Sequence, residues 1–189
     1  FRHPQYHRVI VNIGGISNLT DLPPHGPVCG FDCGPGNLLM DAWVRKHWQR
    51  DYDANGQLAA SAAPDDALFQ KLIRHPFLDQ SPPKSTGRED FSEDWLSGFL
   101  QGHESPISVL STLLDLTVFA IARDIQRQLE ELGYQPLEIA TTGADAIAFA
   151  ARPAAISFEA ANPRHAHEWA LFETLRLPEG KILIPGVIE

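Results

Sequence analysis

The stretch Gly30-Phe-Asp-Cys-Gly-Pro-Gly-Asn37 places a lone carboxylate, Asp32, directly before a glycine-rich turn. A second glycine turn precedes it in Val11-Asn-Ile-Gly-Gly-Ile-Ser-Asn-Leu-Thr20, and an apolar run leads into each turn. Glycine tolerates positive φ, so such turns present several backbone N–H groups to an anion without a Cβ in the way. Because Asp32 ends a strand predicted over residues 28–32, we expect it to project into a cleft that handles phosphate.

Apolar patterning around these turns predicts alternating strands and helices. Residues 8–13 and 16–22 form a predicted hairpin around Gly14-Gly15. The segment 78–89 is predicted to be an irregular loop. The remaining predicted elements are a helix over 38–49 with Asn37 as its N-cap, a short helix over 64–74, a long helix over 106–132 between Ser105 and Gly133, and a strand over 137–142. This alternation is typical of the α/β class.

Length, charge and cysteine content limit the kind of protein. The chain of 189 residues fits one domain or one large lobe, and it starts at Phe1 without a methionine, as a fragment does. Its net charge of −9 argues against a nucleic-acid partner, since that affinity comes from clustered Lys and Arg. We expect no membrane partner and no signal peptide, because no apolar run approaches about 20 residues. Cys29 and Cys33 are expected to be reduced thiols in a cytoplasmic protein.

The first turn is a candidate phosphate-binding element. Backbone N–H groups around Gly14 and Gly15, together with the amides of Asn12 and Asn18, suit the terminal phosphates of a nucleotide. The alternative is an ordinary tight hairpin in which Gly-Gly serves the turn geometry alone. The pattern is neither a Walker A loop nor the Rossmann glycine fingerprint, which excludes two familiar nucleotide-binding folds.

The second turn is a candidate catalytic element. A carboxylate such as Asp32 can accept a proton from a substrate. The turn from Gly34 to Gly36 leads into a predicted helix N-terminus at Asn37, where free N–H groups and the helix dipole favour anions. In the alternative interpretation, Asp32 caps the turn through hydrogen bonds to its own backbone.

The segment Pro82-Pro-Lys-Ser-Thr-Gly-Arg-Glu89 is a third candidate element. Lys84, Ser85 and Thr86 would hold a sugar substituent or orient the cleft, and Arg88 suits a carboxylate. The alternative is a solvated loop that carries a lysine and an arginine without any such role. The histidines form no convincing ligand set, so we predict no metal held by the protein itself.

In their order, these motifs resemble the anhydro-N-acetylmuramic acid kinases, a family of the sugar kinase, Hsp70 and actin superfamily. The run 12–20 looks like the family's second phosphate-binding hairpin. The run 30–43 resembles its most distinctive motif, with Cys33 where threonine is usual. Further matching blocks follow in the expected order: Tyr52-Asp53, Asn55-Gly56, the segment 82–89, and Ser111-Thr-Leu113, in which Ser111 replaces alanine.

The resemblance implies a fold and a division of the chain. Residues 1–152 would form the C-terminal lobe of an α/β kinase with the actin-like, ribonuclease H-like fold, a mixed sheet flanked by helices. Residues 153–189 would be a divergent tail, and the N-terminal lobe of the family is absent. The adenosine-binding run departs from the family's triple glycine, and only Gly143 and Ala144 match it in register. The resemblance implies that these two residues lie beside the adenosine.

The resemblance also implies a reaction on 1,6-anhydro-N-acetylmuramic acid. Water opens the anhydro bridge while ATP phosphorylates the 6-oxygen, giving N-acetylmuramate 6-phosphate for peptidoglycan recycling. Asp32 would be the general base that activates the water, and Mg²⁺ would bridge the phosphates of ATP. The residues implied to bind are Asn12, Gly14, Gly15 and Asn18 for phosphate, and Gly34, Gly36, Asn37, Lys84, Ser85, Thr86 and Arg88 for the sugar or the cleft.

Two other interpretations stay open. The chain is then either a non-catalytic sugar- or nucleotide-binding remnant, or an interaction module that uses the long helix predicted over 106–132, for example in a homodimer. Since kinases of this superfamily bind ligands between two lobes, we expect the isolated chain to be inactive even as a member of the family.

Overall fold

The computed structural model describes residues 1–131, apart from residues 3 and 6, together with the strands at 175–177 and 180–182. The strand predicted over 137–142, with Gly143 and Ala144, lies outside these residues. Strands and helices are both present, which confirms the α/β class in its coarse form. The elements in chain order are β1 (Arg8–Ile13), β2 (Ile16–Leu22), β3 (Cys29–Pro35), α1 (Leu38–Trp48), the single 3₁₀ turns η1 (Ala54–Gly56) and η2 (Ala59–Ser61), α2 (Asp66–Leu72), α3 (Pro76–Asp79), α4 (Glu93–Ser97), α5 (Pro106–Glu131), β4 (Leu175–Leu177) and β5 (Gly180–Ile182).

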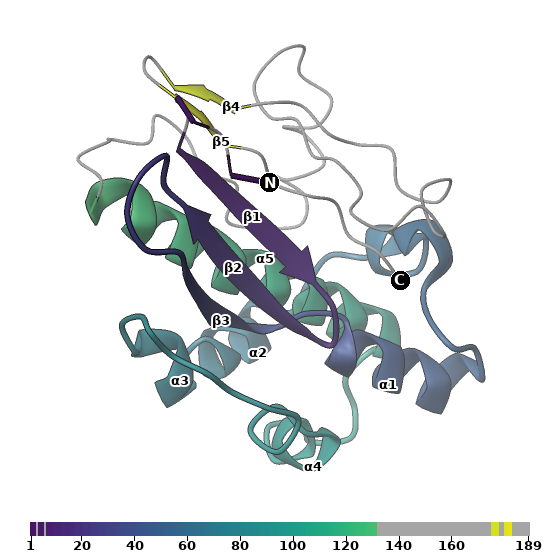
Figure 1. Ribbon diagram of the computed structural model, residues 1–189. Coiled ribbons are helices and arrows are strands. Elements are labelled where there is room, and N and C mark those ends of the chain that lie inside the picture. Colours follow the sequence, from purple (N-terminus) through teal and green to yellow (C-terminus); the bar gives the residue numbers. More distant parts are fainter. Residues whose placement is uncertain (3, 6, 132–174, 178–179, 183–189) are drawn as a thin grey trace.

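The predicted hairpin of β1 and β2 belongs to a three-stranded antiparallel sheet in the order β1-β2-β3 (Figure 1). Val11, Leu19 and Phe31 face one another across the strands and are buried. They pack against Ile121 and Ile125 of α5, which crosses behind the sheet in Figure 1. Because side chains alternate along each strand, the next row of residues points to the opposite face of the sheet.

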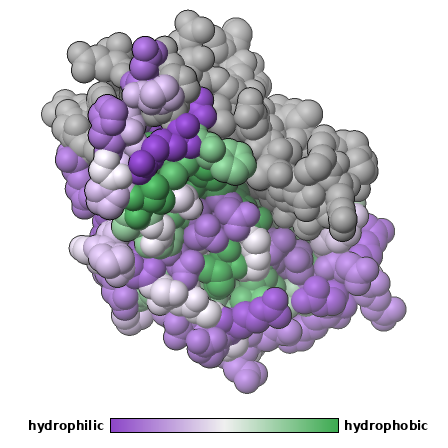
Figure 2. All heavy atoms as spheres, in the orientation of Figure 1, coloured by the Kyte–Doolittle hydropathy of each residue, from purple (hydrophilic) through white to green (hydrophobic). Residues whose placement is uncertain are grey.

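A second, larger core lies among the helices. Buried apolar side chains of α1, α2, α3, α4 and α5 form it, and Phe91 lies within it, fully buried. Trp43 joins α1 to the start of α5, because its indole Nε1 donates to the carbonyl oxygen of Pro106 at 2.8 Å. Figure 2 shows apolar side chains in the middle of one face of the molecule, surrounded by hydrophilic residues. This core fixes α1 and α5 relative to the sheet, and both helices carry parts of the candidate site.

Strand β3 and the start of α1 differ from the prediction. β3 continues to Pro35 instead of ending at Asp32, because an irregularity in its pairing with β2 lets it pass the first glycine of the turn. Asn37 precedes α1 as predicted, but its side chain makes no capping hydrogen bond. Backbone carbonyl oxygens in the turn between β1 and β2 accept hydrogen bonds from the N–H groups at the start of α1 instead.

Of the short helices after α1, the sequence predicts α2 but not α3 or α4. α2 lies inside the predicted range 64–74 and begins at Asp66, after its N-cap Asp65, whose carboxylate accepts from the backbone N–H of Leu68 at 3.0 Å. The sequence pattern did not predict α3 or α4, which have four and five residues. Helices this short depend on their caps and on tertiary packing more than on periodicity.

Helix α5 agrees with the predicted long helix, but its most buried side differs. Apolar residues at helical spacing, among them Leu110, Leu114 and Val118, predict the side of this helix that lies against the core, whereas Leu114 and Val118 are only half-buried. The buried residues on α5 instead include Leu113, Leu116, Thr117, Ala120 and Asp124. Two polar residues, Thr117 and Asp124, therefore face the protein interior.

Helix α5 differs from the expectation that no apolar run is long enough to cross a membrane. The stretch Pro106–Gln128 is long and apolar enough to cross a membrane, with a mean hydropathy of 1.5. Within it, 56% of the most apolar window is buried inside the protein. Core helices of folded domains have this property, so length and composition are weak evidence for a membrane span here.

Candidate active site

Asp32 lies in a row of polar residues on the open face of the sheet. In the strand register, Asn12 of β1 pairs with Asn18 of β2, and Asn18 pairs with Asp32 of β3. Directly opposed residues in antiparallel strands have Cβ atoms about 5 Å apart. The two asparagines of the predicted phosphate hairpin and the predicted general base are therefore neighbours on one surface.

A bulge in β3 separates Asp32 from the glycine turn. Ser17 pairs with Gly34 while the next residue, Asn18, pairs with Asp32, so Cys33 has no partner on β2. Cys33 is fully buried, whereas Asp32 is half-buried. Bulges of this kind occur next to active sites, where they redirect a side chain. Burial, with Asp124 and Asp32 close by, raises the pKa of the Cys33 thiol well above its ordinary range, so this residue stays a thiol.

The carboxylate of Asp32 is held by residues 84–86, which we call the support segment. Its Oδ2 accepts from the hydroxyl of Ser85 at 2.8 Å and from the backbone N–H of Thr86 at 2.9 Å. The backbone N–H of Asp32 donates to the carbonyl oxygen of Lys84 at 3.0 Å. The structure thus brings the second and third predicted elements together, and the alternative of an isolated solvated loop does not describe residues 84–86.

Backbone contacts join the two glycine turns in what we call the glycine junction, residues 14–15 and 36–38. The carbonyl oxygen of Gly14 accepts from the N–H of Asn37 at 2.9 Å, and that of Gly15 accepts from the N–H of Gly36 at 2.9 Å and of Leu38 at 3.3 Å. These are donors at the start of α1, so the expectation of free N–H groups at this helix N-terminus is wrong for these three. The turn between β1 and β2 caps the helix.

Close packing explains Gly34 and Gly36. A Cβ on Gly36 would lie 2.0 Å from the carbonyl oxygen of Gly14, and one on Gly34 would lie 3.0 Å from atoms of Ala120 and Leu78. On the far side of the junction, the hydroxyl of Thr117 donates to the carbonyl oxygen of Gly36 at 2.8 Å. These glycines are needed for the approach of backbone and helix, whereas their predicted contact with a sugar stays a prediction.

Lys84 is buried beneath the site. Its ammonium nitrogen lies 2.8 Å from Oδ2 of Asp124 on α5, and each side chain is 1% exposed. The ammonium also lies 4.8 Å from the ring centre of Phe77, and Arg127 places a guanidinium nitrogen 3.5 Å from Oδ1 of Asp124. Burial raises the pKa of the Asp124 carboxyl and the ammonium of Lys84 opposes that shift. The charge of Lys84 therefore lies in the interior of the protein, so the expectation that its side chain lies at the cleft is wrong.

The remaining predicted residues are less informative. Arg88 is exposed beyond the support segment, and Thr86 donates its hydroxyl to Asp90 at 2.6 Å, which closes the loop around Arg88. Both cysteines are free, as expected, with Cys29 exposed. Among the described residues there is no group of three His, Cys, Asp or Glu that could hold a metal ion.

Sequence reasoning missed Asp124. The signal was an acidic residue one turn from Ala120 and two from Thr117, on a helix face that is otherwise apolar or hydroxylic. A carboxylate at such a position requires a cation, and Lys84 is the cation that the fold supplies.

Comparison of the sequence with known proteins finds one matching family model and relatives of the same name. The family model for anhydro-N-acetylmuramic acid kinase matches residues 1–156. A curated relative of that name from Nitrosospira multiformis is 56% identical over 125 residues, covering 66% of this chain and 34% of the relative. A second from Thiobacillus denitrificans is 44% identical over 157 residues, covering 82% of this chain and 42% of the relative. The matched part of the chain therefore spans less than half the length of these relatives.

Proposed function

Since the chain belongs to the anhydro-N-acetylmuramic acid kinase family, we propose that it forms the C-terminal, actin-like lobe of a sugar kinase. The substrate is 1,6-anhydro-N-acetylmuramic acid, the phosphoryl donor is ATP, and the product is N-acetylmuramate 6-phosphate in the recycling of peptidoglycan in the cytoplasm. Residues 1–152 supply one wall of the active site, and an N-terminal lobe supplies the other.

In the proposed reaction, Asp32 accepts a proton from water as the water oxygen bonds to C1 of the sugar. The bond between C1 and the bridging 6-oxygen breaks, and its electron pair stays on that oxygen. The 6-oxygen then bonds to the γ-phosphorus of ATP as the bond to ADP breaks. The proton remains on Asp32 until it returns to solvent, so charge and atoms balance.

The observation that carries this proposal is the row Asn12, Asn18 and Asp32. In this row a carboxylate lies beside the amide of Asn18, with the amide of Asn12 next to it. The proposed base and the proposed phosphate site would therefore share one surface. Asp32 is fixed on Oδ2 by Ser85 and Thr86, which are the donors the structure gives to this carboxylate. A held but half-exposed carboxylate suits a base that must meet a water molecule.

ATP would bring Mg²⁺ with it. Magnesium in kinase sites is held by one or two carboxylates together with substrate phosphates and water. The ion would be held chiefly by the phosphates of the nucleotide and by water. When bound, the ion would neutralise charge on the transferred phosphate.

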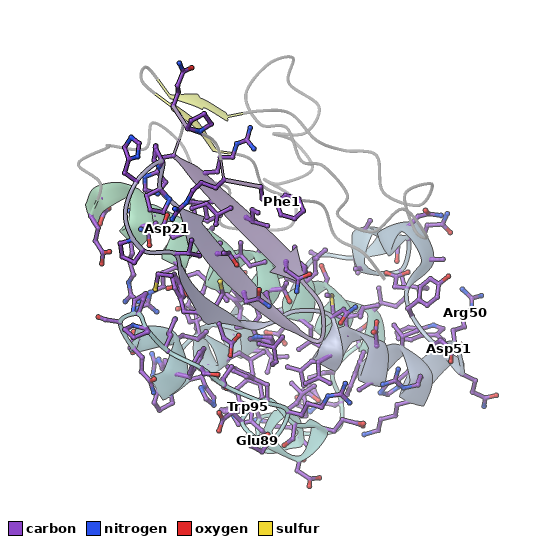
Figure 3. The ribbon with its side chains drawn as sticks, viewed as in Figure 1. Phe1, Asp21, Arg50, Asp51, Glu89 and Trp95 are labelled. Carbon is purple, nitrogen blue, oxygen red and sulfur yellow. The ribbon has the colours of Figure 1, made fainter. Side chains whose placement is uncertain are left out.

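The test uses a chimera that joins this chain to the N-terminal portion of the Nitrosospira multiformis relative. We expect sugar-dependent release of ADP by the chimera, and a fall in turnover of about 10²–10⁴-fold in Asp32→Asn with similar sugar affinity. Asp21→Asn is the matched control, because Asp21 pairs with His7 at the end of the sheet away from the glycine turn (Figure 3). Near-normal turnover in Asp32→Asn shows that another group activates the water.

The isolated chain provides a second test. With one wall of the site, it cannot position both reactants, so we expect no sugar-dependent ADP release from it. Calorimetry with ATP and with the anhydro sugar then separates the alternatives. Binding of both ligands supports the kinase lobe, binding of one supports a remnant, and binding of neither supports an interaction module.

A further inference from the structure

The ion pair of Lys84 and Asp124 is unusual in its burial. Both side chains are 1% exposed. Besides each other, the groups close to them are the guanidinium of Arg127 and the thiol of Cys33, which both lie by the carboxylate of Asp124. Removing two charges from water is unfavourable, and apolar residues of similar size stabilise an interior as well or better. Stability alone does not account for this pair.

The pair links two elements that are distant in sequence. Lys84 begins the support segment, whereas Asp124 lies on α5, behind the sheet. The same lysine accepts a hydrogen bond from the N–H of Asp32 through its own carbonyl oxygen at 3.0 Å. Its side chain is thus attached to α5 and its backbone to the strand that carries the proposed base.

The next two residues complete the connection. Ser85 and Thr86 donate to Oδ2 of Asp32 at 2.8 and 2.9 Å, and they follow Lys84 directly. A shift of Lys84 along β3 would move both donors away from the carboxylate. A charge pair is directional in a way that an apolar contact is not, so it can select one register of the support segment.

We propose that Lys84 and Asp124 are positioning residues whose buried ion pair sets the register of the support segment and so orients the carboxylate of Asp32. The catalytic meaning of this role rests on the proposed function, but the positioning itself is a property of the chain without ligand. Neither residue touches the substrate.

The test measures amide hydrogen exchange by NMR in the 189-residue chain. The reporters are the N–H groups of Asp32 and Thr86, each compared with the N–H of Leu19 in the sheet core of the same sample. Lys84→Met breaks the pair and is expected to destabilise the whole chain. The double variant Lys84→Met/Asp124→Leu removes both charges and keeps the volume, so we expect it to fold with a urea midpoint like that of the wild type.

In the double variant, we expect exchange at Asp32 and Thr86 to be at least about 10-fold faster than in the wild type, with Leu19 unchanged. The matched control is Arg123→Met/Asp79→Leu, which removes an ion pair of the same helix that is not buried. The control should leave all three reporters unchanged. Unchanged exchange at Asp32 and Thr86 in the folded double variant overturns the proposal, as does an equal effect of the control.

This result is independent of the kinase assay. If Asp32→Asn in the chimera keeps its turnover while the double variant loosens the support segment, the role of Asp32 as the base fails and the positioning stands. If Asp32→Asn loses turnover while exchange in the double variant is unchanged, the role of Asp32 as the base stands and the positioning role fails.

Discussion

The glycine junction and the support segment, which form two sides of the candidate site, are stabilised by different interactions. The glycine junction uses backbone hydrogen bonds and contacts that leave no room for a Cβ, and it contains no charged side chain. The support segment depends on a buried charge pair and on side-chain donors to Asp32. The first side is therefore sensitive to shape and the second to charge. Substitutions that change one property without the other separate them.

The largest effect that we expect from shape alone is that of Gly36→Ala. The new Cβ would lie 2.0 Å from the carbonyl oxygen of Gly14, so the junction must open and lose hydrogen bonds at the start of α1. We expect a loss of about 3 kcal/mol or more in the free energy of unfolding, measured by urea denaturation.

Gly30→Ala is the matched control for that substitution. A Cβ at Gly30 would meet its nearest atom, the carbonyl oxygen of Leu19, at 3.6 Å, which is an ordinary contact. We expect a change within about 0.5 kcal/mol. Equal losses for the two glycines would show that the junction is not as tightly packed as its geometry indicates.

An intermediate effect is expected from Thr117→Val. The substitution keeps the shape and removes the hydroxyl that donates to the carbonyl oxygen of Gly36, leaving that buried oxygen without this donor. We expect a loss of about 1–2 kcal/mol in unfolding free energy by urea denaturation. Thr117→Ser keeps the donor and should lose less. If serine is the worse substitution, packing of the methyl group outweighs the hydrogen bond.

The smallest effect concerns a charge close to the junction. Burial raises the pKa of Asp41, in the first turn of α1, from 3.8 to about 6. The folded state then binds more protons than the unfolded state between these values, so this group favours folding at low pH and that contribution is lost as the pH rises through about 6.

Asp41→Asn removes this titration. We expect the variant to gain about 1 kcal/mol or less over the wild type between pH 4 and pH 7, since partial exposure screens the group. Urea denaturation at both pH values measures the difference. Asp51→Asn, an exposed carboxylate just beyond α1, is the control. A gain for Asp41→Asn that is equal at both pH values would contradict the raised pKa.

The sequence predicts correctly those elements that depend on residues close together in the chain. Gly14-Gly15 between β-branched runs predicted the β1–β2 hairpin, and apolar periodicity predicted α5. α3 was missed because four residues carry no periodicity. Asn37 is the N-cap residue of α1 as predicted, but the N–H groups there are not free. They donate to backbone carbonyl oxygens of a turn more than 20 residues earlier. A sequence pattern cannot predict such a contact, because every residue has a backbone carbonyl.

The candidate site shows the same limit. Asp32 and the residues 84–86 were predicted separately. Asp32 and Ser85 are 53 positions apart in the sequence, so their contact depends on the chain between them folding back. Lys84 was expected to hold a sugar substituent or orient the cleft, or else to belong to a solvated loop, and both expectations leave its charge accessible. Its burial follows from Asp124, 40 positions later (124 − 84), on a helix that the sequence analysis treated as apolar.

The support segment has a second consequence, which concerns solubility. β3 is the outer strand of the described three-stranded sheet, and an outer strand offers unpaired N–H and C=O groups to any other chain that adds a strand there. At Asp32 that position is already taken by the carbonyl oxygen of Lys84. The contact that orients a carboxylate thus also blocks intermolecular strand addition, so variants that release residues 84–86 will self-associate through β3 as well as lose the arrangement around Asp32.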